Sequence, residues 1–358
     1  MKEQELSIIV PIYNGQDYIE DCIGSILGQK DSAQHEIVVV NDGSTDNTEN
    51  ILFDFAKTNK NIHIINQKNS GVSIARNNGI IASHGKYITF VDCDDMVGLN
   101  TPVFDKYFQN SKVLRQIKNL STVKSYQFPY QFNAYHFTND YFENMLNAAK
   151  DTKADVILGG KITVNLNMSY SIRQVYDYDV LYKNEDFEEQ NIIMRHAHVR
   201  ESANFALYRR DFINKYNLYF LPNMNLDEDI LFCMLSVLYA DKVATTKDVT
   251  YFYNRHENTL SNMLNYHETC IKFMIAIIKR FSYLLNAMSK NPKFSRLFNY
   301  WIKEYSKKGC EYVYEPGDFP PDDCHYWCDK NECNNCRIAN SMCENFIKNI
   351  QKYCGNVK

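Results

Sequence analysis

The sequence lacks the signals of a membrane or secreted protein. No stretch reaches the roughly 18 uninterrupted apolar residues of a membrane-spanning helix, and the nearest candidate, Met274 to Leu285, is broken by Lys279 and Arg280. The first residues, Met1 to Glu5, show no long apolar region followed by a small-residue cleavage site, which a signal peptide would have. We therefore expect a cytoplasmic protein.

An excess of positive charge is also missing. The 39 Lys and Arg residues face 43 Asp and Glu residues, and the net charge is −4. Such a chain has no overall basic field for nucleic acid, so we expect no nucleic-acid partner. Two phosphate-binding fingerprints, G-x-G-x-x-G and G-x-x-x-x-G-K-[ST], are absent as well, and this argues against a dinucleotide-binding or P-loop protein.

Cysteine, in contrast, is abundant and unevenly placed. Seven of the 11 cysteines lie between Cys310 and Cys354. Four of them have the ligand chemistry of a structural Zn²⁺ site, namely Cys324, Cys328, Cys333 and Cys336. Their spacing differs from a pair of C-x₂-C knuckles, so a zinc site and unligated thiols in helical packing both stay open. Disulfides are disfavoured by the expected compartment.

The first hundred residues alternate between two patterns. Ile- and Val-rich runs predict strands at 6–10, 36–40, 62–65 and 87–91. Apolar residues at helical spacing predict helices at 18–27, 46–56 and 71–83, between those strands. This alternation predicts an α/β fold with a mostly parallel sheet flanked by helices.

Polar or aromatic residues follow three of these strands, at Tyr13-Asn14, Asn41-Asp42 and Asp92 to Asp95. The carboxyl ends of parallel strands share one edge of the sheet, where ligands bind, so we expect these groups to line one crevice. Pro11 and Tyr13 offer a flat apolar platform for a base. Asp42 offers an acceptor for a base N–H.

The strand at 87–91 delivers three carboxylates to one point, Asp92, Asp94 and Asp95. Carboxylates so close together repel one another and are costly to bury unpaired. Mg²⁺ and Mn²⁺ prefer oxygen ligands and often bind through one or two carboxylates together with substrate phosphates. The set therefore predicts a metal-held diphosphate, and the alternative is an acidic turn that caps the next helix.

The remainder of the chain divides by its pattern into segments. Residues 1–103 alternate as described, and 104–137, where the pattern weakens, form an insertion or flap. Residues 138–265 alternate again. Residues 266–358 form a helical, Cys-rich C-terminal region.

Four blocks in the first half carry a family resemblance. They are Ile8 to Asn14 (IIVPIYN), Val40 to Asp46 (VNDGSTD), Asn69 to Asn77 (NSGVSIARN) and Phe90 to Asp95 (FVDCDD). In this order and spacing the chain resembles the family 2 glycosyltransferases with the GT-A fold, of the bacterial polysaccharide type. The resemblance is strong from residue 6 to about 100 and weaker to about 261, through Leu207 to Phe212, Glu228-Asp229 and Tyr253 to His256.

The resemblance implies that residues 1–103 are the nucleotide-binding half of a GT-A domain and that residues 138–265 are its acceptor-side half. It also implies roles for individual residues. Pro11 and Tyr13 would flank the base, usually uracil, and Asp42 would bind it. Gly71 and Arg76 would lie by the ribose and diphosphate. Asp92 would contact the ribose or the metal, Asp94 would ligate Mn²⁺ or Mg²⁺, and Asp95 would belong to the donor or acceptor side. All of these identities are read from the printed sequence.

The resemblance also implies a catalytic base, Asp229, in the Glu-Asp pair before a predicted helix. The alternative reading of Asp227 to Asp229 is helix capping, because acidic residues stabilise a first helical turn. Arg255 and His256 would touch the diphosphate from a C-terminal loop, or else belong to a solvated loop.

The function that follows is inverting transfer of a sugar from a nucleotide-sugar, a UDP-sugar above all, in the manner of a hexosyltransferase (EC 2.4). The acceptor would be a saccharide or a lipid-linked molecule in cell-surface polysaccharide synthesis. Peripheral contact with the inner face of the cytoplasmic membrane would follow, with Lys303, Lys307 and Lys308 as a candidate surface. A metal-dependent nucleotidyltransferase and a non-catalytic saccharide-binding relic remain the alternatives.

Overall fold

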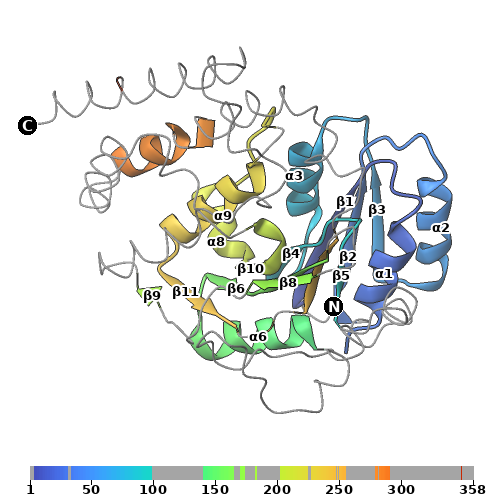
Figure 1. Cartoon of the computed structure of the whole chain (residues 1–358), viewed down its shortest axis with the longest axis horizontal. Coiled ribbons are helices and arrows are strands. Elements are labelled where there is room, and N and C mark those ends of the chain that lie inside the picture. Colours follow the sequence, from blue (N-terminus) through green and yellow to red (C-terminus); the bar gives the residue numbers. More distant parts are fainter. Residues whose placement is uncertain are drawn as a thin grey trace, which may run out of the picture.

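The computed structural model describes residues 4–30, 34–98, 140–164, 170–173, 182–183, 202–224, 227–246, 248, 250–254, 279–280, 282–290 and 348. Its central feature is an eight-stranded sheet with the order β3-β2-β1-β4-β10-β6-β11-β9 (Figure 1). The strands of this sheet are β1 (Leu6–Ile12), β2 (Glu36–Asn41), β3 (Ile62–Asn66), β4 (Tyr87–Phe90), β6 (Val156–Leu158), β9 (Tyr182–Lys183), β10 (Ala206–Arg209) and β11 (Lys242–Thr245).

The first four strands of this sheet are mutually parallel, as the sequence predicted. Beyond β4 the sheet is mixed, because β10 runs antiparallel to both β4 and β6. A second, four-stranded sheet has the order β5-β12-β7-β8. It consists of β5 (Met96–Val97), β12 (Tyr251–Asn254), β7 (Lys161–Val164) and β8 (Tyr170–Arg173).

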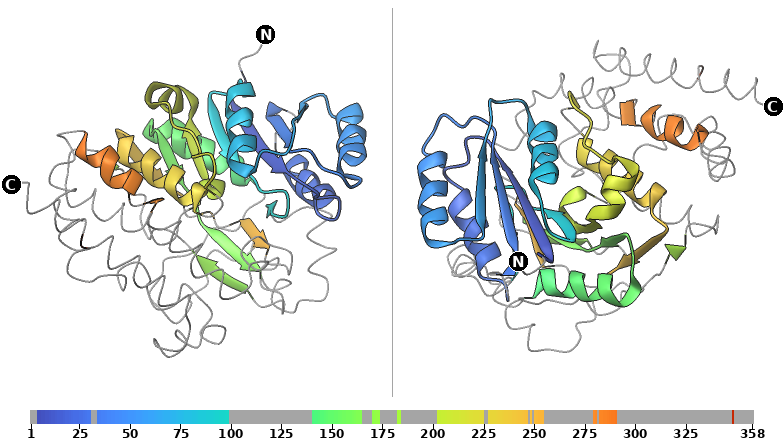
Figure 2. Two further views of the ribbon diagram at one scale, coloured as in Figure 1. Left: turned by 90° about the horizontal axis from the view of Figure 1, so that it is seen from above. Right: turned by 180° about the vertical axis from the view of Figure 1, so that it is seen from behind.

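Helices cover both faces of the large sheet (Figure 2). One face carries α1 (Ile19–Leu27), α2 (Thr48–Thr58) and α6 (Tyr141–Thr152), and the other carries α3 (Val72–Ala82), α8 (Arg210–Tyr216) and α9 (Glu228–Tyr239). A 3₁₀ helix, η2 (Ala203–Phe205), precedes β10. Among the described residues, no helix has the length and apolar character needed to cross a membrane.

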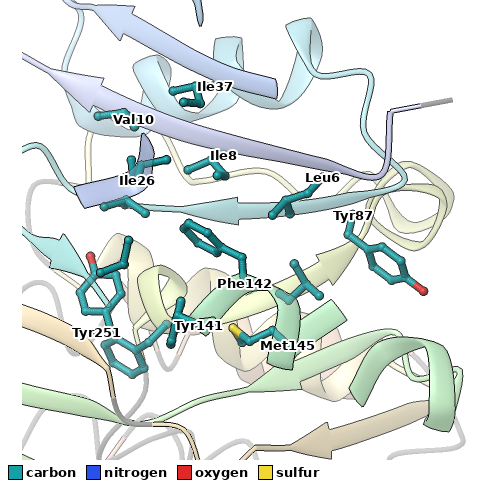
Figure 3. Close-up of a cluster of buried hydrophobic side chains, with 14 of the residues drawn as sticks. Leu6, Ile8, Val10, Ile26, Ile37, Tyr87, Tyr141, Phe142, Met145 and Tyr251 are labelled. Atoms are coloured by element: carbon teal, nitrogen blue, oxygen red, sulfur yellow. The ribbon is translucent and has the colours of Figure 1, made fainter. Parts of the chain in front are cut away.

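The two faces follow from the alternation of side chains along a strand. Leu6, Ile8 and Val10 of β1 are fully buried against α1 and α6, as Figure 3 shows. Ile9 points to the opposite face, where Gly79 of α3 meets it. A Cβ at Gly79 would lie 2.4 Å from Cγ2 of Ile9, so the absence of a side chain there allows α3 to lie directly on the sheet.

Strand β1 extends past the end of its ladder with β4. The last register pair is Ile9 with Phe90, whereas pairing with β2 continues to Ile12. Pro11 is buried in this extension, and it has no N–H to donate to the chain that follows β4. The N–H of Val91 still donates to the carbonyl of Ile9 (3.0 Å), and the chain leaves the sheet after Val91, where the acidic residues of the candidate site begin.

The positions of the predicted helices and strands agree with the structure, with shifted bounds. Helix α2 begins at Thr48, two residues later than predicted. The reason is that Asp46 binds other groups, since its carboxylate accepts hydrogen bonds from the N–H groups of Thr48 (3.0 Å) and Gln16 (3.1 Å). The predicted insertion at 104–137 and most of the region 266–358 lie outside the described residues, although 279–280 and 282–289 are helical.

The described residues on either side of 99–139 are joined by one side chain, that of Gln29. Its amide donates to the carbonyl of Val97 (3.0 Å) and accepts from the N–H of Tyr141 (3.1 Å). Gly98 lies against it with a φ of +80°, and a Cβ there would fall 2.0 Å from Nε2 of Gln29. Val97 and Tyr141 are therefore held close together by Gln29.

A buried carboxylate at the opposite edge of the sheet gives a test of the fold. Burial raises the pKa of Glu36, but hydrogen bonds from the His84 N–H (2.9 Å) and the Ser7 hydroxyl (2.5 Å), together with the His84 ring, lower it below its ordinary value overall. We predict that Glu36→Gln lowers the free energy of unfolding at pH 7 by about 1–3 kcal/mol.

The sign of the pH dependence follows from the lowered pKa. The stabilisation by ionised Glu36 is complete above the unfolded-state pKa of about 4.3 and is lost as the pH falls through the lower folded-state pKa. Urea unfolding from pH 7 to pH 3 should therefore show the variant and wild type converging at low pH. The exposed Glu20, changed to Gln, is the control. A constant difference at all pH values would contradict the assignment.

Candidate active site

The loops after β1 and β2 hold each other at the carboxyl edge of the sheet. Asn14, with a φ of +50°, donates its N–H to Ser44 (2.9 Å) and accepts from the N–H of Thr45 (2.8 Å). Tyr13, which precedes Asn14, is 50% exposed, so its side chain is accessible to a flat ligand. Pro11 is buried inside β1, and its place beside a base stays a prediction.

Asp42 organises the loop before α3. Its buried carboxylate accepts hydrogen bonds from the amide of Gln67 (2.7 Å) and from the N–H groups of Ser70 (2.7 Å) and Gly71 (2.8 Å). Gly71 has a φ of +90°, a conformation that favours glycine. The carboxylate predicted to bind a base thus has three partners within the chain, and Oδ2, which holds only Gly71 among them, keeps capacity for one more donor.

The acidic cluster after β4 is assembled as predicted. Asp92, Asp94 and Asp95 each offer one carboxylate oxygen, and these oxygens lie within 4.8 Å of one another. Asp92 and Asp94 are partly exposed, whereas Asp95 is 1% exposed. Burial, followed by the charges of Asp94 and Asp92, raises the pKa of Asp95 well above its ordinary value.

Asp95, predicted on the donor or acceptor side, is bound within the protein. Its carboxylate accepts from the hydroxyl of Tyr251 (2.7 Å) and the N–H of Asn254 (3.0 Å). The amide of Asn254 also donates to the carbonyl of Asp94 (2.8 Å). Asp95 therefore anchors strand β12 beneath the cluster and leaves the exposed edge to Asp92 and Asp94.

Arg76 of α3 joins the cluster to helix α9. Its guanidinium donates to Asp92 (Nη2 to Oδ1, 2.7 Å) and to Glu228 (Nη1 to Oε1, 2.7 Å), and its side chain is only 3% exposed. It also lies over the ring of Phe220, 5.1 Å from the centroid. Both ends of the guanidinium thus bind carboxylates of the protein, and the place of Arg76 by the ribose and diphosphate stays a prediction.

Two residues that sequence reasoning missed complete the site. The amide of Asn204, in η2, donates to Oδ2 of Asp92 (2.5 Å), and the hydroxyl of Ser202 donates to Oδ2 of Asp229 (2.6 Å). Ser202 also accepts from the N–H of Asn204 (3.4 Å). No local motif marks these residues in the sequence, and only the packing of η2 between β4 and α9 brings them to the site.

Three consecutive acids at the start of α9 have three different partners. Asp227 pairs with Arg280 (2.9 Å) and Glu228 pairs with Arg76. Asp229 accepts hydrogen bonds from Ser202 and from the N–H of Ile230 (2.8 Å). Among the described residues, Asp229 is thus the acid of the three that has no cation within ion-pair distance.

These surroundings also affect Glu228 electrostatically. Burial, together with the charge of Asp229, raises the pKa of Glu228 to about 7, although Arg76 opposes the rise. Two linked groups of carboxylates therefore face each other across Arg76. One belongs to the acidic cluster after β4, and the other to the first turn of α9.

The donor set of the cluster fits a hard divalent cation. Carboxylate oxygens are the ligands that Mg²⁺ and Mn²⁺ prefer, and Asp94 and Asp92 are partly exposed at one point. Several other predicted site residues lie outside the described residues. They are Arg255 and His256, predicted at the diphosphate, the four cysteines of the possible zinc site, Cys324, Cys328, Cys333 and Cys336, and the surface lysines Lys303, Lys307 and Lys308.

The chain is similar to known glycosyltransferases. Residues 7–100 match the model of glycosyl transferase family 2. The uncharacterised glycosyltransferase EpsJ of Bacillus subtilis (strain 168) is 29% identical over 72% of this chain, and the matched part is 63% of EpsJ. The poly(ribitol-phosphate) beta-glucosyltransferase of Bacillus spizizenii is 32% identical over 33% of this chain and 20% of its own.

A solved structure shows the fold. TarS 1-349 of S. aureus, crystallised in complex with UDP-GlcNAc, has a TM-score of 0.50 and 19% identity, covering 76% of this chain and 66% of that chain. The mostly parallel sheet, flanked by helices and carrying an acidic cluster after β4, is that of a GT-A protein. Residues 7–100 are therefore similar to glycosyl transferase family 2.

The Arg76 bridge predicts a large stability effect. Removal of one partner from a buried ion pair costs about 3–5 kcal/mol, and Arg76→Met would leave Asp92 and Glu228 facing each other without the cation. We expect urea unfolding to show a loss of this size. Lys57→Met is the control, because Lys57 pairs with Asp54 at the surface, where such a pair contributes at most about 1 kcal/mol. An equal effect of the two substitutions would refute the bridge.

Proposed function

We propose that this protein is an inverting glycosyltransferase that uses a nucleotide-sugar donor and Asp229 as its catalytic base. The observation that carries the proposal is the pairing at α9, where Asp227 and Glu228 are each held by an arginine, while Asp229 is held by a neutral hydroxyl and a backbone N–H. Among the described residues no cation lies within ion-pair distance of Asp229, so no ion pair competes with an acceptor hydroxyl for its carboxylate.

In the proposed reaction Asp229 removes the proton from an acceptor hydroxyl. The acceptor oxygen forms a bond to the anomeric carbon from the face opposite the leaving group, and the bond from that carbon to the diphosphate oxygen breaks. The electron pair leaves with the diphosphate, so the configuration at carbon is inverted. A divalent ion held by Asp94 and Asp92 would supply Lewis-acid stabilisation of that leaving charge.

The donor side is built from the first two loops. Tyr13 is exposed and flat, and Asp42 keeps acceptor capacity at Oδ2 beside Gly71, which is exposed as well. These features support a base and ribose at the β1–β2 edge and a diphosphate near Asp94. Uracil is the proposed base. The complex of TarS with UDP-GlcNAc shows that this nucleotide-sugar binds to a protein of the same fold.

The acceptor is proposed from the relatives. One of them is named for a glucosyl transfer to poly(ribitol-phosphate), so we propose a saccharide or lipid-linked acceptor in cell-surface polysaccharide synthesis. A nucleotide-sugar donor and such an acceptor would place the reaction at the inner face of the cytoplasmic membrane. The chain spans 63% of EpsJ, and the activity of the whole protein is part of this proposal.

Glu228 is the competing candidate for the base. Its pKa of about 7 is near the optimum for general base catalysis. Its geometry is unfavourable, however, because its side chain is 10% exposed and its carboxylate is bound to Arg76 at 2.7 Å. A general base must first reach the proton of the acceptor hydroxyl, and its pKa matters only after that. This requirement favours Asp229 over Glu228.

The metal site has a test that does not require turnover. We expect Mn²⁺ with UDP to raise the midpoint of thermal unfolding of the wild-type protein, because a ligand that binds the folded state at 100 times its Kd stabilises it by about 2.7 kcal/mol. Asp94→Ala should abolish this shift, and Asp54→Ala, at the exposed surface of α2, should retain it. A full shift in Asp94→Ala would remove Asp94 from the metal site.

The base assignment is tested by turnover. A panel of UDP-sugars with Mn²⁺, followed by release of UDP, should identify the donor for the wild type. Asp229→Asn should bind UDP like the wild type and lose about 10²- to 10⁴-fold in turnover, the contribution of a general base. Asp211→Asn, an exposed acid in the first turn of α8, is the matched control. A greater loss in Glu228→Gln than in Asp229→Asn would move the role to Glu228.

A further inference from the structure

A hydrogen-bonded path connects the acidic cluster to the proposed base through η2. Asn204 donates to Asp92, Ser202 accepts from the backbone N–H of Asn204, and Ser202 donates to Asp229. A second path runs from Asp92 through Arg76 to Glu228, the chain neighbour of Asp229. The two paths close a ring that includes β4, α3, α9 and η2.

The side chain of Asn204 has a cost in folding free energy that a purely structural residue would not have. The residue is 4% exposed, and its Oδ1 has no hydrogen-bond partner among the residues that the structure describes. A buried acceptor without a partner costs about 1–3 kcal/mol, and an apolar side chain of similar size would avoid that cost. The Nδ2 bond to Asp92 is the favourable contact that the side chain makes there.

Ser202 has a comparable double task. Its hydroxyl is the N-cap of η2, since it accepts from the N–H of Asn204. The same oxygen carries the proton that is donated to Asp229. Because donation to a carboxylate fixes the orientation of that carboxylate, a shift of η2 would move Asp92 and Asp229 together.

We propose that Ser202 and Asn204 are positioning residues, and that η2 sets the separation between the donor-holding carboxylate Asp92 and the base Asp229. Asn204 acts through Asp92 on the binding of the metal and donor diphosphate. Ser202 acts through Asp229 on the transfer step. This inference rests on the proposed function, because it assigns each residue to one half of that reaction.

The assignment predicts that two neighbouring substitutions have separable effects. Asn204→Ala should weaken binding of UDP with Mn²⁺ by about 10-fold or more, the usual effect of losing a group that orients a metal ligand. Ser202→Ala should leave UDP binding as in the wild type and lower turnover of the donor from the UDP-sugar panel by about 10-fold. Ser202→Thr keeps the hydroxyl and should restore turnover.

Matched controls exist elsewhere in the chain. Asn144 donates its amide to the Asp248 carboxylate (2.8 Å), the same kind of bond as that of Asn204, on α6. Ser236 donates its hydroxyl to the Phe232 carbonyl (2.8 Å) within α9. Asn144→Ala and Ser236→Ala should be less stable in thermal unfolding. In these two variants, UDP affinity, measured by calorimetry, and turnover should change in the same ratio.

The results distinguish the two levels of proposal. If the wild type neither binds UDP with Mn²⁺ nor turns over any UDP-sugar, the proposed function fails. If the wild type is active but Ser202→Ala and Asn204→Ala lower affinity and turnover in the same ratio as the controls, η2 is merely structural and the inference is overturned. A failure of Ser202→Thr to restore turnover in a folded protein would also overturn the role of the hydroxyl.

Discussion

The carboxylate of Asp92 is the contact on which the site depends. One of its oxygens accepts from Arg76 and the other from Asn204, so a single side chain after β4 is bound to α3 and η2 and, through Arg76, to the first turn of α9. These elements come from the family domain and from the later half of the chain. The strands of both halves share one sheet, and Asp92 joins them again at its carboxyl edge, where the proposed chemistry takes place.

Several polar residues expected near a ligand also hold parts of the protein together. Arg76 binds two carboxylates, Asp95 binds β12, and Asp42 binds the loop before α3. Buried polar groups need partners within the protein, and these side chains have them. The surface presented to the donor is correspondingly small, and its exposed or partly exposed members are Tyr13, Gly71, Asp92 and Asp94.

The sequence allowed the fold to be predicted because the signals are local. Apolar strands followed by polar turns indicated the parallel sheet, and the run from Asp92 to Asp95 indicated the cluster at its edge. The antiparallel strand β10 and the partners of Asp92 could not be predicted in this way. The bond from Asn204 spans 112 residues of sequence and the bond from Arg76 to Glu228 spans 152, so neither leaves a periodic or spacing pattern. The pairing of Pro11 with Val40 inside the sheet could not be predicted either, because proline is usually excluded from the interior of a sheet.

The amide of Gln29 has a consequence for engineering. It binds the chain on both sides of residues 99–139, so the distance between the two attachment points is set by one side chain and does not depend on how many residues connect them. The entropic free-energy cost of closing such a connection rises by only about 0.6 kcal/mol for each doubling of its length. Peptides of different lengths could therefore be spliced between these two points, as reporters or affinity handles, while the strands on either side keep their register.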